Sequence, residues 1–81
     1  TPEQQVMDAE RLALAETLIA GMPERRRQAL LLHRIEGLTH AEISERLSIS
    51  RQTVIMDIAE AVAELAEGLA RAERRRTPSG G

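Results

Sequence analysis

Apolar side chains recur at helical spacing in the middle of the chain, on either side of a very short interruption. Ile43 and Leu47 lie four residues apart, and Val54 and Ile58 repeat that spacing further on, as expected for one face of each of two helices. Ile49 lies between the two pairs, where it can fill the gap between the helices. The segment therefore predicts two helices joined by a tight turn, which is the helix-turn-helix arrangement.

The residues around this turn favour the same arrangement. Ser44 is small, so the second helix can approach closely there, and Ser50 is a good N-cap for a helix that begins at Arg51. The sequence Thr39–Glu42 is a capping box that opens the first of the two helices, which we expect to end near Leu47. Such units are mostly used to place the second helix in the DNA major groove.

Two further helices are predicted before this unit, and the breaks between them are well marked. The sequence Thr1–Gln4 resembles an N-cap, a proline in the first turn and a capping-box glutamine, so a helix is expected from there to Gly21. Pro23 is typical of a new helix start. The second helix is therefore predicted over residues 23–36, and Gly37 ends it.

The last helix is predicted to begin at Arg51 and to continue past Ala70, because no proline interrupts it before Pro78. A heptad-like spacing connects Ile55, Ile58, Val62, Leu65 and Leu69. The later part of this helix can pack on the first helix or on a partner. We expect Val62 and Leu65 to pack inside the domain.

Together these segments predict an all-α fold of four helices that contains a helix-turn-helix. Residues 1–76 are expected to form a single domain, and residues 77–81 are expected to be a flexible tail. The candidate buried residues of the first two helices are Leu12, Leu18, Ile19, Ala29, Leu30, Leu31 and Ile35.

Composition limits the possible function classes. The 81 residues include no Cys, Phe, Tyr or Trp, so disulfides and cysteine-ligated metals are excluded and the core must be aliphatic. No apolar run is long enough to cross a membrane and no signal-peptide pattern opens the chain. We therefore expect a cytoplasmic protein without membrane insertion. The start at Thr rather than Met indicates a piece of a larger protein.

The net charge of −2 is unusual for a DNA-binding domain, but the distribution of charge is more informative than its sum. All eleven basic residues are arginines. Six lie in the middle of the chain, and four more cluster at residues 71–76, where they either bind a partner or solvate a helix. This separation allows a local basic face on a nearly neutral domain.

Enzymatic and metal-binding patterns are missing from the sequence. His33 and His40 have no metal-site spacing, and no cysteine accompanies them. The carboxylates of Glu60 and Glu64 lie four residues apart on one helix, which fits a solvated face better than an acid/base pair. We therefore expect no enzyme, no cofactor and no metal.

Four segments resemble region 4 of sigma factors, in that family's order and spacing. Gly21–Leu32 is similar to its LPxRxRxxxLL opening, and Glu36–Ile43 is similar to its EGLSxxEIA segment. Leu47–Val54 is similar to the LGISxxTV turn and recognition helix, and Ala59–Leu65 to the ARALxxL that follows. The resemblance covers about residues 19–69, and the extracytoplasmic-function sigma factors are the subgroup that the chain resembles.

The resemblance implies binding to the −35 element of double-stranded promoter DNA and to the β flap of the RNA polymerase core, with an anti-sigma factor as a further partner. The recognition-helix residues that would contact DNA are Arg51, Gln52, Thr53, Ile55 and Met56. The residues that would lie near phosphates are Arg25, Arg26, Arg27, His40 and Arg46.

Several positions depart from the family pattern. Ser48 replaces the usual glycine of the turn, which is tolerable if φ stays negative or if the strain is modest. Ile55 and Met56 stand where the family often has polar or basic residues, and they can touch a thymine methyl but cannot hydrogen-bond a base edge. Asp57 and Glu60 add negative charge where phosphates would run close.

These departures keep three hypotheses open. The first is the sigma region 4 domain, with Arg51 and Gln52 as the main reading residues. The second is a response-regulator effector domain that dimerises through its last helix. The third is a sigma-like module that binds an anti-sigma factor and never touches DNA. Ile55 and Met56 cannot both be buried beside Val54, so this face is also expected to serve recognition of an anti-sigma factor or self-association through the last helix.

Overall fold

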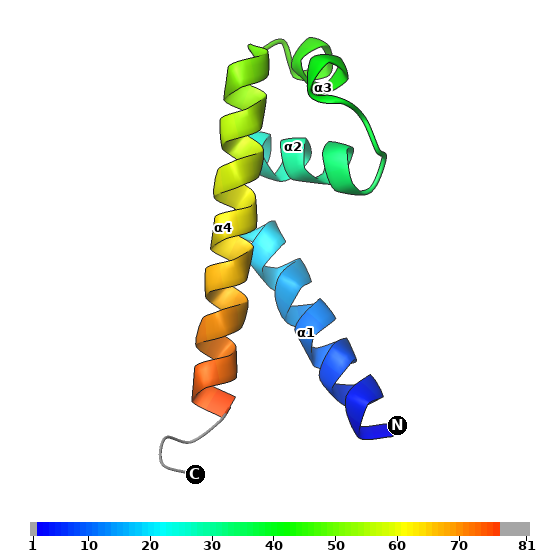
Figure 1. Cartoon of the computed structure of the whole chain (residues 1–81), viewed down its shortest axis with the longest axis vertical. Helices are drawn as coiled ribbons and strands as arrows, with labels where there is room; N and C mark the ends of the chain where they lie inside the picture. The colour runs from blue at the N-terminus through cyan, green and yellow to red at the C-terminus, as the bar shows by residue number, and fades with distance from the viewer. Residues whose placement is uncertain (1, 77–81) are drawn as a thin grey trace.

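The computed structural model describes residues 2–76 as four helices: α1 (Pro2–Ala20), α2 (Glu24–Arg34), α3 (His40–Leu47) and α4 (Arg51–Arg76). Figure 1 shows α4 as the long axis, with α2 and α3 beside its first half and α1 beside its second half. No strand occurs among the described residues. The predicted all-α architecture is confirmed. The predicted N-cap at Thr1 and the tail at residues 77–81 lie outside the described residues.

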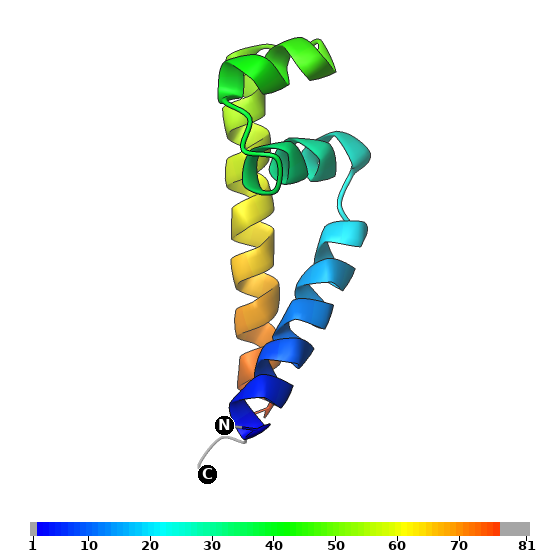
Figure 2. The same ribbon diagram turned by 90° about the vertical axis from the view of Figure 1, so that its right-hand side faces the viewer.

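The helix-turn-helix lies at one end of the molecule. In Figure 2, α3 lies across the start of α4, as expected for this unit. Ser48 ends α3 in the left-handed conformation, with φ of +56°. This backbone turn brings the Ile49 N–H within 3.1 Å of the Ser44 carbonyl, which accepts its hydrogen bond. The tight turn therefore contains a serine with a positive φ, a conformation that is strained for a residue with a Cβ. Glycine adopts this conformation without that cost.

Both helices of the unit begin with side-chain caps. In α3 the Thr39 hydroxyl accepts from the Glu42 N–H at 3.1 Å, and the Glu42 carboxylate accepts from the Thr39 N–H at 2.9 Å. The predicted capping box is confirmed. The hydrogen bond that the Glu42 carboxylate accepts from the Thr39 backbone, and then an interaction with the Thr39 side chain, lower the pKa of Glu42. At the start of α4, Ser50 Oγ accepts from the Thr53 N–H at 3.1 Å, so the predicted N-cap is also confirmed.

The boundaries of α2 differ slightly from the prediction. Pro23 is the N-cap residue rather than the first helical residue. The helix ends at Arg34, two residues before the predicted end, and Gly37 adopts a positive φ of +72°. The Leu32 carbonyl then accepts a hydrogen bond from the Leu38 N–H at 3.0 Å, which satisfies one of the carbonyls left open at the helix end.

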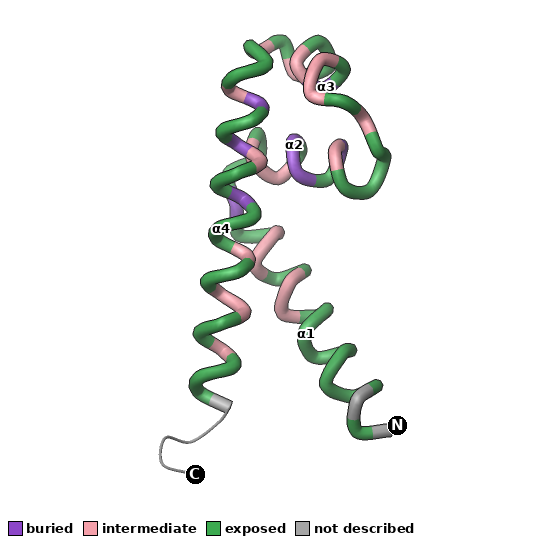
Figure 3. The backbone as a smooth tube through the Cα atoms, viewed as in Figure 1, coloured by how far each residue is buried: buried purple, intermediate pink, exposed green. Residues whose placement is uncertain are grey.

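The main core joins α2, α3 and the first half of α4. Ala29, Ile43 and Val54 are completely inaccessible to solvent and Leu32 is buried beside them. Ile49 packs against this cluster from the turn, as predicted, but it is half-buried rather than fully buried. Figure 3 places most of the buried positions in α2 and in the first half of α4. One small aliphatic cluster therefore packs the start of α4 against α2 and α3.

A second cluster connects α1 and α2 to the middle of α4. Met22, Leu30 and Ala61 are buried there, with Ile19 and Leu65 packed against them. Further along α4, Gly68 lies so close to α1 that an added Cβ would come within 2.7 Å of the Leu18 side chain. Because the glycine has no side chain, the two helices can approach closely at this point.

Several predicted core residues are in fact exposed. Leu12 is 62% exposed, although Ile19, seven residues later on nearly the same side of α1, packs against the second cluster. Leu31 and Ile35 are also exposed, at 36% and 77%. Leu31 lies about 100° round the helix from the buried Leu30, and Ile35 lies about 60° from the buried Leu32. Leu65 is half-buried as expected.

Val62 likewise remains 39% exposed, although we expected it in the core. It lies about 100° round α4 from the fully buried Ala61. Its side chain therefore borders the open side of α2 rather than the second cluster.

The left-handed conformation of Ser48 predicts the effect of two substitutions. Ser48→Gly should stabilise the domain by about 0.5–1 kcal/mol, because glycine adopts a positive φ without the steric cost of a Cβ. Ser50→Ala should destabilise it by about 1 kcal/mol through loss of the N-cap. Denaturant unfolding of the two variants measures both. Equal effects of the same sign would contradict this account of the turn.

The capping box predicts a dependence of stability on pH. The folded state holds the pKa of Glu42 below its unfolded value, so its contribution is complete above the unfolded pKa and is lost as the pH falls through the folded pKa. Glu42→Gln should therefore reduce the drop in melting temperature between about pH 6 and about pH 3. Glu45→Gln is the control, since the Glu45 carboxylate forms no hydrogen bond within residues 2–76. An unchanged drop for Glu42→Gln would contradict the prediction.

Candidate nucleic-acid interface

The first turns of α4 present a distinct outer face. Arg51, Gln52, Ile55, Met56 and Ala59 are all exposed, whereas their neighbours on the inner side are buried in the main core or against α2. Ile55 is 48% exposed and Met56 is 54% exposed. The prediction that at least one of this pair is exposed is confirmed. This face contains one cation, one amide and three apolar side chains.

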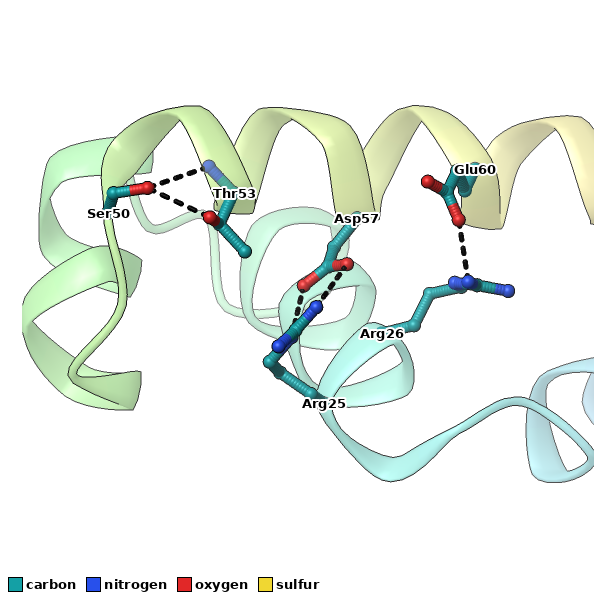
Figure 4. Close-up of polar contacts among 6 residues, drawn as sticks. All are labelled: Arg25, Arg26, Ser50, Thr53, Asp57 and Glu60. Atoms are coloured by element: carbon teal, nitrogen blue, oxygen red, sulfur yellow. Dashed lines mark hydrogen bonds and ion pairs between the residues drawn. The ribbon is translucent and has the colours of Figure 1, made fainter.

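Thr53 has a structural role instead. Its side chain is half-buried, and its hydroxyl lies 2.8 Å from Ser50 Oγ, as Figure 4 shows. The hydroxyl is therefore engaged in the cap at the start of α4. A contact between Thr53 and a base would require this hydrogen bond to be shared or broken.

A partly buried ion pair joins the recognition helix to α2. The Asp57 carboxylate accepts two hydrogen bonds from the Arg25 guanidinium, from Nε at 2.8 Å and from Nη2 at 3.2 Å (Figure 4). The Asp57 side chain is 7% exposed and that of Arg25 is 58% exposed. The hydrogen bond to Asp57, and then the attraction of its charge, raise the pKa of Arg25. The two-point geometry fixes the orientation of the guanidinium as well as its distance.

Arg26 makes a second connection between the same helices. Its guanidinium donates to the Glu60 carboxylate from Nη2 at 2.6 Å and to the Glu64 carboxylate from Nη1 (Figure 4 draws the contact with Glu60). Asp57, Glu60 and Glu64 thus form an acidic row along one side of α4 that faces the two arginines. We refer to these five residues as the α2–α4 ion ladder.

The ion ladder changes how two groups of predicted site residues are interpreted. Arg25 and Arg26 were expected near phosphates, but both are held in ion pairs within the domain. Asp57 and Glu60 were expected to repel phosphates, yet each faces an arginine. Sequence spacing does not reveal these pairs, because the partners lie 32–38 residues apart.

The other predicted phosphate-contacting residues are arranged differently. Arg27 is half-buried and Arg46 is exposed, and within residues 2–76 neither they nor Arg51 form an ion pair. His40, at the start of α3, stacks on His33 with ring centroids 5.1 Å apart. His33 Nδ1 in turn lies 3.1 Å from the Leu38 carbonyl, which accepts its hydrogen bond. The histidine pair thus braces the loop before α3.

No group of three or more His, Asp or Glu side chains is placed to hold a metal ion in residues 2–76. Over the same residues, none of the helices combines the length and the apolar character that crossing a membrane requires.

Comparison with known proteins places this helix-turn-helix in context. A family model described as sigma-70, region 4 matches residues 12–65. The ferric citrate uptake sigma factor FecI of Escherichia coli (strain K12) is 34% identical over 62 residues, which are 76% of this chain and 36% of that protein. The chain therefore spans about a third of the length of this curated relative. No solved structure matches the chain.

The ion pair between Arg25 and Asp57 predicts that removing each partner has a different effect on stability. Arg25→Ala should destabilise the domain more than Asp57→Asn, because it leaves a buried carboxylate without its cation. We expect a loss of about 1–2 kcal/mol for Asp57→Asn, which keeps the shape of the side chain. The double variant Arg25→Ala/Asp57→Ala should be more stable than Arg25→Ala alone. Chemical denaturation measures all three.

Arg71→Ala is the control for this series, because it removes an exposed ion pair with Glu67 within α4. It should have a negligible effect on stability. If Arg25→Ala behaved like Arg71→Ala, the pair with Asp57 would contribute little to the position of α2.

Proposed function

The chain belongs to the sigma-70 region 4 family, and from this premise we propose that it binds the −35 element of promoters as the DNA-binding domain of an extracytoplasmic-function sigma factor. It is accordingly a transcription-initiation module and not an enzyme. The observation that carries the proposal is the outer face of α4, which begins with the exposed Arg51 and Gln52 directly after the capped turn. Recognition helices meet base edges with the side chains of their first turns.

The electrostatics of the domain support this proposal despite its net charge of −2. Three of the acids on α4 face Arg25 and Arg26, so most of their charge is offset within the domain. Arg27, Arg46 and Arg51 are then available to approach phosphates. Affinity should therefore depend on a few cations and fall only moderately with salt.

An apolar groove supports binding to RNA polymerase. It lies between α1, α2 and α4, and its lining includes Leu30, Leu31, Ile35, Val62, Leu65 and Leu69. This groove accounts for the unexpected exposure of Leu31, Ile35 and Val62. We propose it as the surface for the β flap of the polymerase core, since an exposed apolar groove suits an amphipathic helix. Arg34 at the groove would favour an acidic partner.

A second candidate function is a sigma-like module that binds an anti-sigma factor instead of DNA. The exposed pair Ile55 and Met56 favours it. Asp57 and Glu60, which also suggested it from the sequence, favour it no longer, because their charges are paired with arginines. Family membership decides against the response-regulator hypothesis.

Selection from randomised duplexes at two salt concentrations tests the proposed function. We expect one class of sequence to be enriched, with an affinity that falls as the salt concentration rises. If no sequence were enriched at either concentration, the domain would not be a promoter reader, and the interaction module would be favoured.

Two substitutions separate reading of bases from contact with phosphates. Arg51→Ala should cost about 1–3 kcal/mol of binding free energy on the selected duplex and relax the preference at one base position. Arg27→Ala should weaken all duplexes alike and reduce the slope of log affinity against log salt by about one. Fluorescence anisotropy on selected and scrambled duplexes measures both effects.

Arg71→Ala serves as the control for the loss of one positive charge, since Arg71 lies far along α4 and pairs with Glu67. It should leave both the affinity and the salt slope unchanged. Losses from Arg51→Ala that were equal on the two duplexes would assign Arg51 to phosphate contact instead of base reading.

A further inference from the structure

The outer face of the recognition helix is unusually apolar for a surface proposed to enter DNA. Gln52, Ile55, Met56 and Ala59 lie within an arc of about 100° around the first turns of α4, and all are exposed. Only Gln52 can form a hydrogen bond with its side chain. We refer to these four residues as the reading face.

The chemistry of the major groove restricts what the reading face can contact. Base edges present hydrogen-bond donors and acceptors there, and the thymine methyl is the apolar group among them. Ile55, Met56 and Ala59 have no side-chain donor or acceptor, so contact with other base edges would desolvate those edges without replacing their hydrogen bonds. Thymine methyl groups are therefore the part of the major groove that these side chains can contact without leaving base-edge hydrogen bonds unsatisfied.

We infer that the reading face of α4 selects promoter DNA by the thymine methyl groups of an A·T-rich element, with Ile55 and Met56 as the specificity-determining residues. This inference rests on the proposed function, because it requires α4 to lie in the major groove. Gln52 fits the same sequence class, since a glutamine amide can pair with the N6 and N7 atoms of adenine. Arg51 adds one contact of a different kind, to guanine or phosphate.

Two features of the structure favour DNA over a protein as the occupant of the reading face. The carboxylate of Asp57 is buried against Arg25 and that of Glu60 is held by Arg26, so these acids are directed toward α2 and away from phosphates. The start of α4, with its capped N-terminus and Arg51, is electropositive. The groove between α1, α2 and α4 provides a separate apolar surface for a protein partner.

Replacing thymine by deoxyuridine tests this inference, because it removes the methyl group and leaves the base-edge hydrogen bonds unchanged. The probe is a duplex recovered from the randomised pool, resynthesised with one thymine at a time replaced. Burial of one methyl group predicts about a two- to fivefold loss of affinity at each contacted thymine. Positions outside the contact should show no change.

Protein variants then assign each methyl to a side chain. Ile55→Ala and Met56→Ala should each abolish the deoxyuridine effect at one thymine while keeping it at the other. Both side chains are about half exposed and alanine favours helix, so the variants are expected to fold, which circular dichroism checks. Leu12→Ala is the control: Leu12 is an exposed apolar residue of α1 at 62%, and its truncation should leave every deoxyuridine effect intact.

The outcomes separate this inference from the proposed function. Sequence-specific binding with no loss at any deoxyuridine position would overturn the inference and leave the promoter-binding proposal standing. Absence of specific binding to any duplex would overturn both. If the alanine variants kept the deoxyuridine effects and instead abolished self-association in sedimentation, the reading face would be a protein interface and the inference would be wrong.

Discussion

The carboxylate of Asp57 imposes the constraint that organises this domain. Asp57 lies on the recognition helix with only 7% of its side chain exposed, and a charge so buried requires a partner. Arg25 of α2 meets this requirement with two hydrogen bonds. Since both bonds depend on the relative position of the two helices, the pair fixes how α2 lies against α4. The side of α4 that carries Asp57 thereby becomes an inner side, and the reading face is turned outward.

Arg26 extends the same constraint along α4, and the consequence is electrostatic as well as structural. Its contacts with Glu60 and Glu64 place three acids and two arginines in one ladder between the helices. The ladder pairs the two arginines with acids of the same domain, and it offsets most of the charge of the three acids. A domain with a net charge of −2 can in this way present a reading face without negative charge.

The two halves of α4 have different roles. Its first half packs on α2 and α3 through the cluster around Ile43 and Val54, and it carries the reading face. Its second half packs on α1 and α2, with Gly68 allowing close approach of Leu18. The two faces proposed for partners are consequently separate surfaces: DNA at the start of the helix, and an apolar protein segment at the groove further along it.

The sequence alone determined what depends on near neighbours in the chain. Helical spacing, the capping box at Thr39 and the N-cap at Ser50 predicted the four helices and the helix-turn-helix, because these signals act over three or four residues. The exposure of at least one of Ile55 and Met56 followed from their angles relative to Val54 on one helix. Only the tertiary structure decided that Leu31 and Ile35 border an open groove and that Arg25 and Arg26 pair with acids on α4. Helical periodicity fixes the angles between side chains within one helix, but it does not specify which distant helix covers each side, and long arginine side chains select their partners only after the helices have packed.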